Sequence, residues 1–444
     1  MNSGRRQTGG PIREGPGTKT VRVLLINDNS AHPNWGAQAT PFALKRILQR
    51  SVPGVEIEAL SWDWLRRRYR RLCIPIMRET LWNEDSWRGL RPVLFRLSTP
   101  ADFFPPVADD FDTYADDWLA GRGGPQAVQF LNLAREADVV VYNGENSIYR
   151  NTEEGCHSLF LLWVAKTRLG KPSCIVNHTA DLNEVRPIMN GMVQLVDPVL
   201  DLVATREPCS LRNLEGLGVH NAVLFPDVVF GEDPAEVRSN AFELWRRKVG
   251  LGDQPYFCFS GSGLPVSAPG PGRDGAAGEL VRAIEALGVR PVFLARDPHC
   301  LFLEEVARRV GGVYFGPEHE FAELWPLFKD ARFLVTGHFH YAIIGAMVGC
   351  PFVPLSTNNH KMRGVCELLR WRRTEPFDIT WLRGCGPDVI AEAAKILEDR
   401  ESLSAHLLER SAELRAEAQG LGERIAEISR SARASAPSGA GGKA

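Results

Sequence analysis

The stretch VRVLLINDNSAHPNWGAQATPFALKRILQ, residues 21–49, decides the fold. Its first part, residues 21–27, is mostly apolar and ends in a polar residue, which is typical of a buried strand. Residues 28–39 form a polar loop that contains a glycine, and residues 40–49 carry apolar side chains at helical spacing. A strand, a glycine-containing loop and a helix in this order predict the first unit of an α/β domain.

The same alternation continues along the chain in two series. In the first series, further strands are predicted at 55–59, 137–142, 171–177, 201–204 and 222–225, with helices at 156–169, 192–199 and 207–217. The second series has strands at 256–261, 289–295, 313–315, 333–336 and 351–354, with helices at 278–287, 301–310, 318–328 and 341–348. Short apolar strands that alternate with helices predict parallel, doubly wound sheets.

We therefore expect an α/β protein of two Rossmann-like domains that face each other across a cleft. The N-terminal domain is placed at 20–232 and the C-terminal domain at 250–385, with a turn rich in Gly, Asp and Pro between them. A segment rich in Ala, Glu and Leu predicts C-terminal helices over 386–430. The chain ends, 1–19 and 431–444, are expected to be disordered tails.

The composition narrows the class of protein. Of the 444 residues, 44% are hydrophobic and 24% are charged, so the chain has enough apolar material for two ordinary cores. Lys and Arg number 52 against 54 Asp and Glu, and this balance argues against a nucleic-acid-binding protein. The longest mostly apolar run, 341–355, is too short to span a membrane. Nine cysteines without a CxxC pair indicate reduced thiols, no zinc site and a cytoplasmic protein.

Five polar loops are placed where predicted strands end. They are residues 27–39, 143–147, 205–207, 336–340 and 356–361. Each carries His, Asn, Arg or Lys where plain turn residues would suffice. Open α/β sheets bind ligands at the carboxyl ends of their strands, where loops meet helix N-termini. Several such loops in two sheets predict a cleft that binds an anion.

The loop TGHFH at residues 336–340 is the most informative of the five. Its strand ends at Thr336 and a helix begins near His340, so His338 and His340 are expected near the positive end of a helix dipole. The next strand leads to Lys361, and adjacent parallel strands would place His340 and Lys361 on one rim. The alternative is that one histidine caps the helix and the other packs within the loop.

Three other side chains have both a functional and a structural interpretation. Arg206 follows a strand and can extend over the cleft, or it can form a surface ion pair with Glu207. Glu145 is a candidate general base, or it orients a neighbouring Asn or caps a helix. Trp35 can stack on a sugar, or it can cover the loop as part of the core.

At these same five places the sequence resembles the polysaccharide pyruvyl transferase family, from about residue 21 to about residue 369. The order and spacing of six elements make the resemblance specific. The six elements are an N-x-G loop at Asn34-Trp35-Gly36, an NGEG-type loop at Asn143-Gly144-Glu145-Asn146, a GKP strand at Gly170-Lys171-Pro172, an RE turn at Arg206-Glu207, a PD strand end at Pro226-Asp227, and a final block of Gly337-His338-Phe339-His340, Gly349-Cys350-Pro351 and Ser356–Lys361. Two positions depart from the family pattern, because His338 replaces an arginine and Asn146 replaces the last glycine of NGEG.

The resemblance implies transfer of a pyruvyl group from phosphoenolpyruvate to hydroxyls of a sugar or polysaccharide precursor, commonly as a cyclic ketal, in exopolysaccharide biosynthesis. Such a reaction needs cations for a phosphate and a carboxylate, an acid near the methylene carbon and a base near the hydroxyl. The implied acid is His340, and the implied base is Glu145 or Asp28. The implied donor-binding residues are Arg206, His338, Lys361, Asn359 and Ser356. The implied acceptor-binding residues are Asn34, Trp35, Gly36, Asn143 and Asn146.

On this interpretation phosphoenolpyruvate is a co-substrate, and neither a metal nor another cofactor is required. The saccharide acceptor could be lipid-linked, which would bring the protein to the inner membrane surface. Two other functions stay open. A nucleotide-sugar-dependent glycosyltransferase of the same GT-B-like architecture would also use a helix of the C-terminal domain to hold a diphosphate. A non-catalytic family member would keep the fold and bind a saccharide or an anion.

Overall fold

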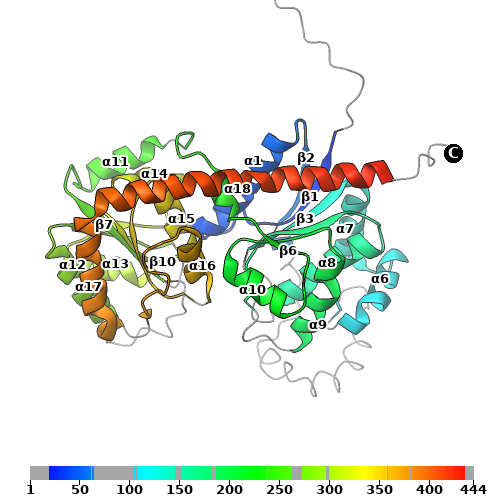
Figure 1. Cartoon of the computed structure of the whole chain (residues 1–444), viewed down its shortest axis with the longest axis horizontal. Helices are drawn as coiled ribbons and strands as arrows, with labels where there is room; N and C mark the ends of the chain where they lie inside the picture. The colour runs from blue at the N-terminus through cyan, green and yellow to red at the C-terminus, as the bar shows by residue number, and fades with distance from the viewer. Residues whose placement is uncertain are drawn as a thin grey trace, which may run out of the picture.

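The predicted fold class is confirmed by the computed structural model, which has two parallel sheets flanked by helices and a helical C-terminal segment (Figure 1). The structure describes residues 20–61, 63–64, 104–105, 108–145, 153–181, 187–237, 239–262, 273–296, 300–357, 359–379 and 382–435. Within these ranges no helix is long and apolar enough to cross a membrane.

The first sheet has the strand order β2-β1-β3-β4-β5-β6, and all its pairs are parallel. Its strands are β1 (Arg22–Asp28), β2 (Glu56–Ser61), β3 (Val139–Glu145), β4 (Ser173–His178), β5 (Leu202–Thr205) and β6 (Ala222–Leu224). The helices are α1 (Trp35–Ser51), α6 (Phe111–Leu119), α7 (Gly124–Glu136), α8 (Glu153–Thr167), α9 (Pro187–Val196) and α10 (Pro208–Gly216). The strand order reverses between β1 and β3, where doubly wound folds bind their ligands.

The second sheet has the order β11-β10-β7-β8-β9 and is also parallel. Its strands are β7 (Tyr256–Ser262), β8 (Arg290–Leu294), β9 (Val313–Phe315), β10 (Leu334–Gly337) and β11 (Phe352–Pro354). The helices are α11 (Asn240–Lys248), α12 (Arg273–Glu285), α13 (Phe302–Val310), α14 (Leu324–Asp330), α15 (Phe339–Met347) and α16 (Lys361–Leu368). This order is that of a Rossmann sheet, with its reversal between β7 and β10.

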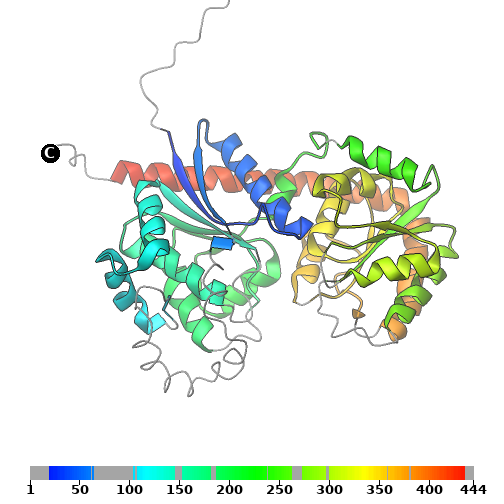
Figure 2. The same cartoon turned by 180° about the vertical axis from the view of Figure 1, so that it is seen from behind.

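The C-terminal segment is a helix pair, α17 (Leu382–Glu398) and α18 (Arg400–Ser435). Helix α18 runs across both domains (Figures 1 and 2) and contacts α1 and α15. The prediction of a disordered tail from residue 431 is wrong for 431–435, because α18 continues there and Arg433 Nε donates to Asp138 Oδ1 at 2.9 Å. This helix therefore ties the end of the chain to the first sheet.

Two differences from the predicted elements affect the site. Helix α1 begins at Trp35, not near residue 40, because the Asn34 side chain caps it by accepting from the N–H groups of Gly36 (2.8 Å) and Ala37 (3.3 Å). Helix α16 was not predicted, because its first residues follow a strand in a run of polar side chains that reads as a loop.

A buried carboxyl group makes the stability of the first domain depend on pH. Asp197 is 1% exposed, neither carboxyl oxygen has a hydrogen-bond partner among the described residues, and burial raises its pKa to about 8. Between about pH 4 and pH 8 the folded state keeps a proton that the unfolded state has lost, so the free energy of unfolding falls as pH rises, by up to about 1.4 kcal/mol per pH unit.

We expect Asp197→Asn to remove this dependence. The measurement is urea denaturation of both proteins at several pH values from 5 to 8. Wild-type stability should decline across this range relative to the variant, whose side chain at this position cannot ionise. Parallel profiles would show that Asp197 does not titrate in the way that its burial requires.

Candidate active site

A buried ionic cluster joins the two domains at the carboxyl ends of β5 and β10. Arg206, directly after β5, is 2% exposed, and its Nη1 donates to Asp227 Oδ2 at 2.9 Å. Its Nε donates to Thr179 Oγ1 at 2.7 Å, and its Nη1 lies 3.5 Å from Nε2 of His340, near the start of α15. Arg206 and His340 come from different domains, so the cluster exists only when the domains are together.

Asp227 is the counter-ion for this cluster. Its side chain is 0% exposed, and its Oδ2 also lies 3.4 Å from His340 Nε2, while Oδ1 accepts from the N–H of Val229 at 2.9 Å. Burial alone would raise the pKa of Asp227, but His340 and Arg206 more than offset this and hold the pKa below its usual range. One carboxylate thus faces both the guanidinium of Arg206 and the imidazole of His340.

The predicted alternative for Arg206, a surface ion pair with Glu207, is wrong. Arg206 is buried rather than on the surface, and its carboxylate partner is Asp227. Glu207 instead caps α10, where its Oε2 accepts from the N–H of Ser210 at 3.0 Å. The sequence did not single out Asp227 as a functional residue, although it belongs to the PD element of the family pattern.

One face of helix α1 connects His340 with Glu145. Gly36 lies against His340, and a Cβ added at Gly36 would overlap the imidazole Nδ1. Thr40, four residues later and therefore about one turn along the helix, donates its hydroxyl to Glu145 Oε1. The candidate acid and the candidate base thus contact successive turns of the same helix.

Three asparagines form a buried network under Glu145. Asn27 donates to the Asn143 carbonyl at 2.7 Å, and Asn177 donates to the Asn143 side-chain oxygen at 3.2 Å. Asn143 in turn donates to Thr40 Oγ1 at 3.2 Å. Asn27, Glu145 and Asn177 all have positive φ, at 67°, 40° and 54°. Positive φ is uncommon outside glycine, although Asn adopts it more readily than most residues, and it is enriched at functional sites, which makes these strand ends candidates for a binding or catalytic role.

The other candidate base, Asp28, already accepts hydrogen bonds through both of its carboxylate oxygens. Its Oδ2 accepts from Lys45 Nζ at 2.6 Å and its Oδ1 accepts from the N–H of Ser30 at 3.0 Å. Burial would raise its pKa, but these hydrogen bonds outweigh burial and lower the pKa of Asp28. A carboxylate with a lowered pKa and a bound ammonium is a weak proton acceptor, which leaves Glu145 as the better candidate.

Several residues expected to bind the acceptor have structural roles. Trp35 is 0% exposed, and its Nε1 donates to the His319 carbonyl at 2.8 Å, so the expectation that it stacks on a sugar is corrected. Asn143 is also 0% exposed, inside the asparagine network, so it has no surface for an acceptor. Asn34 caps α1 and Gly36 makes room for His340. Asn146 lies outside the described residues.

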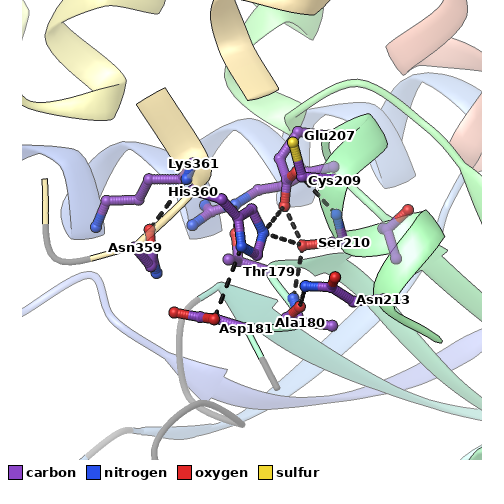
Figure 3. A network of polar contacts seen from close by, with 12 residues as sticks. Thr179, Ala180, Asp181, Glu207, Cys209, Ser210, Asn213, Asn359, His360 and Lys361 are labelled. Carbon is purple, nitrogen blue, oxygen red and sulfur yellow. Dashed lines mark hydrogen bonds and ion pairs between the residues drawn. The ribbon is translucent and has the colours of Figure 1, made fainter. Parts of the chain in front are cut away.

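Apart from Arg206, which follows β5, the residues expected to bind the donor follow β10 and β11. Asn359 Oδ1 accepts from the N–H of Lys361, the first residue of α16, at 3.1 Å (Figure 3). The hydroxyl of Ser356 accepts from the N–H of Ile379 at 3.0 Å. His338 Nε2 lies 3.5 Å from Cys300 Sγ. Arg206 contacts the candidate acid His340 across the domain boundary, and Lys361 begins the helix that follows the neighbouring strand β11.

A histidine that sequence analysis missed completes the surroundings of Arg206. His178 ends β4 and is 1% exposed, and burial, together with the nearby charges of Arg206 and His360, lowers its pKa to about 3. His178 is therefore neutral at physiological pH, and it places an uncharged polar side chain near Arg206. Its cross-strand neighbour is Glu145. Only the end of a fully buried strand pointed to this position.

Replacing Gly36 with alanine should displace His340 and lower transferase activity about 100-fold, because a misplacement of about 1 Å at a reacting group has an effect of this size. The matched control is Gly191→Ala in α9, where an added Cβ meets nothing within 4 Å. Activity of both variants and their thermal unfolding are to be measured. Equal activities would show that the contact between Gly36 and His340 does not matter.

Among the described residues, no group of three or more His, Cys, Asp or Glu side chains could hold a metal ion. The site therefore consists of an arginine, a histidine, a shared carboxylate and a separate glutamate, together with the rim at α16. Such a set can bind an anion and move protons.

Comparisons with known proteins identify the family and the fold of the chain. A family model described as polysaccharide pyruvyl transferase matches residues 34–359, and no curated protein matches the sequence. UDP-GlcNAc 2-epimerase from Neisseria meningitidis, bound to UDP-GlcNAc, has a TM-score of 0.51 at 10% identity and covers 92% of this chain and 100% of its own. HepE from Anabaena, in complex with UDP and glucose, has a TM-score of 0.51 at 12% identity and covers 93% and 98%. These two likenesses show the GT-B fold alone. Because the family model covers well over half of the sequence, the chain belongs to the polysaccharide pyruvyl transferase family.

Proposed function

We propose that the protein transfers a pyruvyl group from phosphoenolpyruvate to hydroxyl groups of a saccharide. The observation that carries the proposal is the meeting of Arg206 and His340 across the domain boundary, 3.5 Å apart, over the single carboxylate of Asp227. A protonated His340 gives this cluster a net positive charge. An anionic donor would offset that charge, and it would draw the domains together by contacting both of them.

In the proposed reaction, His340 donates a proton to the methylene carbon, which becomes a methyl group and leaves C2 electrophilic. A saccharide hydroxyl attacks C2, and Glu145 accepts its proton. A second hydroxyl then attacks C2 as the bond between C2 and the phosphate oxygen breaks, and phosphate leaves with the proton of that hydroxyl. Return of the first proton from Glu145 to His340 through solvent restores the enzyme, so the products are a ketal and hydrogen phosphate.

The placement of Glu145 and His340 supports separate roles for them. They contact Thr40 and Gly36, which are one helical turn apart on α1, so a distance on the order of 5–6 Å separates the two contact points. The proposed acid and the proposed base therefore contact neighbouring turns of one helix, which supports placing both of them at the same site. Glu145 also belongs to the first domain and His340 to the second, so the acceptor and the donor can approach from different sides.

Thermal shift measurements test the proposal. Phosphoenolpyruvate at millimolar concentration should raise Tm, while inorganic phosphate and UDP should raise it less, because only phosphoenolpyruvate offers a phosphate and a carboxylate at the correct spacing. A shift with UDP and none with phosphoenolpyruvate would favour a nucleotide-sugar-dependent glycosyltransferase. A shift with none of the three ligands would favour a family member that does not use this donor.

Replacement of His338 with arginine addresses the main departure from the family pattern. An imidazole loses its charge between about pH 5 and pH 8, whereas a guanidinium keeps its charge and offers a bidentate fork. We expect phosphoenolpyruvate binding to wild-type protein to weaken from pH 6 to pH 8. His338→Arg should tighten binding at pH 8 about tenfold, the equivalent of one charge-assisted hydrogen bond.

The measurement is isothermal titration with phosphoenolpyruvate at pH 6, 7 and 8, with His338→Gln as the control that removes the charge at every pH. Any pH dependence that arises elsewhere in the protein is common to all three proteins, so only the contribution of residue 338 differs between them. Unchanged or abolished binding in His338→Arg would show that His338 has a different role, such as its contact with Cys300.

A further inference from the structure

A second contact between the domains lies one residue beyond Arg206. Glu207 has an extended backbone, with φ −154° and ψ 155°, so its side chain points away from that of Arg206. Arg206 meets His340, and Glu207 meets His360, whose Nε2 lies 3.2 Å from Glu207 Oε1. Two adjacent residues of the first domain thus contact two histidines that follow the neighbouring strands β10 and β11 of the second domain.

The hydrogen bonds of Ser210 determine which nitrogen of His360 carries a proton (Figure 3). The Ser210 hydroxyl donates its one proton to Glu207 Oε1 and accepts from the N–H of Ala180 at 2.7 Å. His360 Nε2 lies 3.1 Å from the hydroxyl oxygen of Ser210. Because the hydroxyl proton is already donated to Glu207, this oxygen can offer His360 only a lone pair. His360 Nε2 must therefore be an N–H group that donates to Ser210 and Glu207.

A second carboxylate, that of Asp181, lies on the other side of the His360 imidazole. Its Nδ1 lies 3.8 Å from Asp181 Oδ1, and both side chains are 13% exposed. Among the described residues Nδ1 has no hydrogen-bond partner. The charged and titratable groups around the ring are therefore Glu207 and Asp181, with His178 and the adjacent Lys361 nearby. A proton on Nδ1 would face Asp181, so neither carboxylate repels the protonated ring.

His360 is also the residue that directly precedes helix α16. The helix starts at Lys361, whose N–H donates to Asn359 Oδ1. At Gly364 an added Cβ would lie 2.7 Å from Glu207, so α16 approaches this carboxylate closely and could not do so with a larger residue. Fixing the imidazole therefore fixes the turn that carries Asn359 and Lys361 relative to the first domain (Figure 3).

We propose that His360 is a positioning residue that holds the turn of Asn359 and Lys361 against the first domain and thereby sets the affinity for the anionic donor. The inference rests on the proposed function, because it is the donor that this turn would contact. His360 acts through Glu207, Ser210 and Asp181 and does not touch the reacting atoms. Arg206 contacts His340 after β10, and Glu207 contacts His360 after β11. These two adjacent residues of the first domain therefore hold both loops of the second domain in place.

Three variants test this role kinetically. His360→Ala should raise KM for phosphoenolpyruvate about tenfold and change kcat less than about threefold, as expected for loss of donor binding without loss of chemistry. His360→Gln, whose amide N–H₂ can still donate to Glu207 and Ser210, should recover most of the loss. Arg212→Ala is the matched control, since it removes an exposed ion pair with Glu367 (3.0 Å) between the same two helices, α10 and α16.

Hydrogen exchange of the ligand-free proteins tests the same role without the donor. The amides of residues 361–364 should exchange faster in His360→Ala than in wild type or Arg212→Ala. Equal exchange in His360→Ala and Arg212→Ala, or a loss in kcat at unchanged KM, would overturn the inference. If wild-type protein does not bind phosphoenolpyruvate, the proposed function fails, and with it the role toward this donor, whereas faster exchange would still identify His360 as the residue that holds this turn.

Discussion

Replacing His340 with alanine is expected to lower kcat for pyruvyl transfer about 10²–10⁴-fold, the usual loss when a general acid is removed. His340 is the proposed proton donor to the methylene carbon, and its Nε2 lies within 3.5 Å of both Arg206 and Asp227. The ion pair of Arg206 and Asp227 at 2.9 Å does not need the imidazole, so the fold should persist. Release of phosphate from phosphoenolpyruvate in the presence of a saccharide acceptor measures the effect.

His406→Ala provides the control for this experiment. His406 belongs to α18, and its Nε2 donates to the Leu369 carbonyl at 2.9 Å, away from the ionic cluster. Its removal should leave kcat within about twofold of wild type, because it contributes only one ordinary hydrogen bond to the fold. If His340→Ala keeps wild-type kcat while its Tm is unchanged, His340 is not the acid, and proton donation must come from another group.

The second large effect is on stability, at Asp227. In Asp227→Asn the guanidinium of Arg206, 2% exposed, loses its counter-ion, and an uncompensated buried charge costs about 3–5 kcal/mol. The pKa of Asp227 is lowered in the folded state, because His340 and Arg206 outweigh burial. Its contribution is therefore complete at neutral pH and is lost as pH falls below about 4, the unfolded value, toward the lower folded value.

Urea denaturation at pH 7 and at pH 3 measures both parts of this prediction. The control is Asp233→Asn, which removes a partly exposed ion pair between Asp233 and Arg415 (3.6 Å), six residues after Asp227, and should cost less than about 1 kcal/mol. The difference between the Asp227 variant and wild type should shrink at the lower pH. Equal losses in the two variants at pH 7 would show that the buried cluster adds no stability.

Much of the fold could be predicted from the sequence, because buried parallel strands are continuous apolar runs. The runs at 21–27 and 256–261 are examples, and they correspond to β1 and β7. The same reasoning failed where local signals were weak. The loop expected up to residue 39 is helical from Trp35, because a single asparagine side chain, Asn34, caps the helix. The helix at Lys361 was missed because it is short and opens with polar residues.

The site was predictable only in part, and for a physical reason. His340 and Arg206 were singled out because each follows a strand, and strand ends of parallel sheets meet ligands. The contacts that define their roles link residues distant in sequence, such as Arg206 with Asp227 and Glu207 with His360. No periodicity or spacing encodes those pairs. For Trp35 the sequence left two interpretations open, stacking on a sugar or covering the loop as part of the core. The structure supports the second, because protein atoms cover the ring completely.

A crystal structure of the protein with phosphoenolpyruvate tests the central claim most directly. We expect the ligand between the domains, with one anionic group at Arg206 and His340 and the other toward Lys361, and with the methylene carbon within reach of the His340 imidazole. Phosphoenolpyruvate bound elsewhere, or a site that admits UDP but not phosphoenolpyruvate under the same conditions, would contradict it.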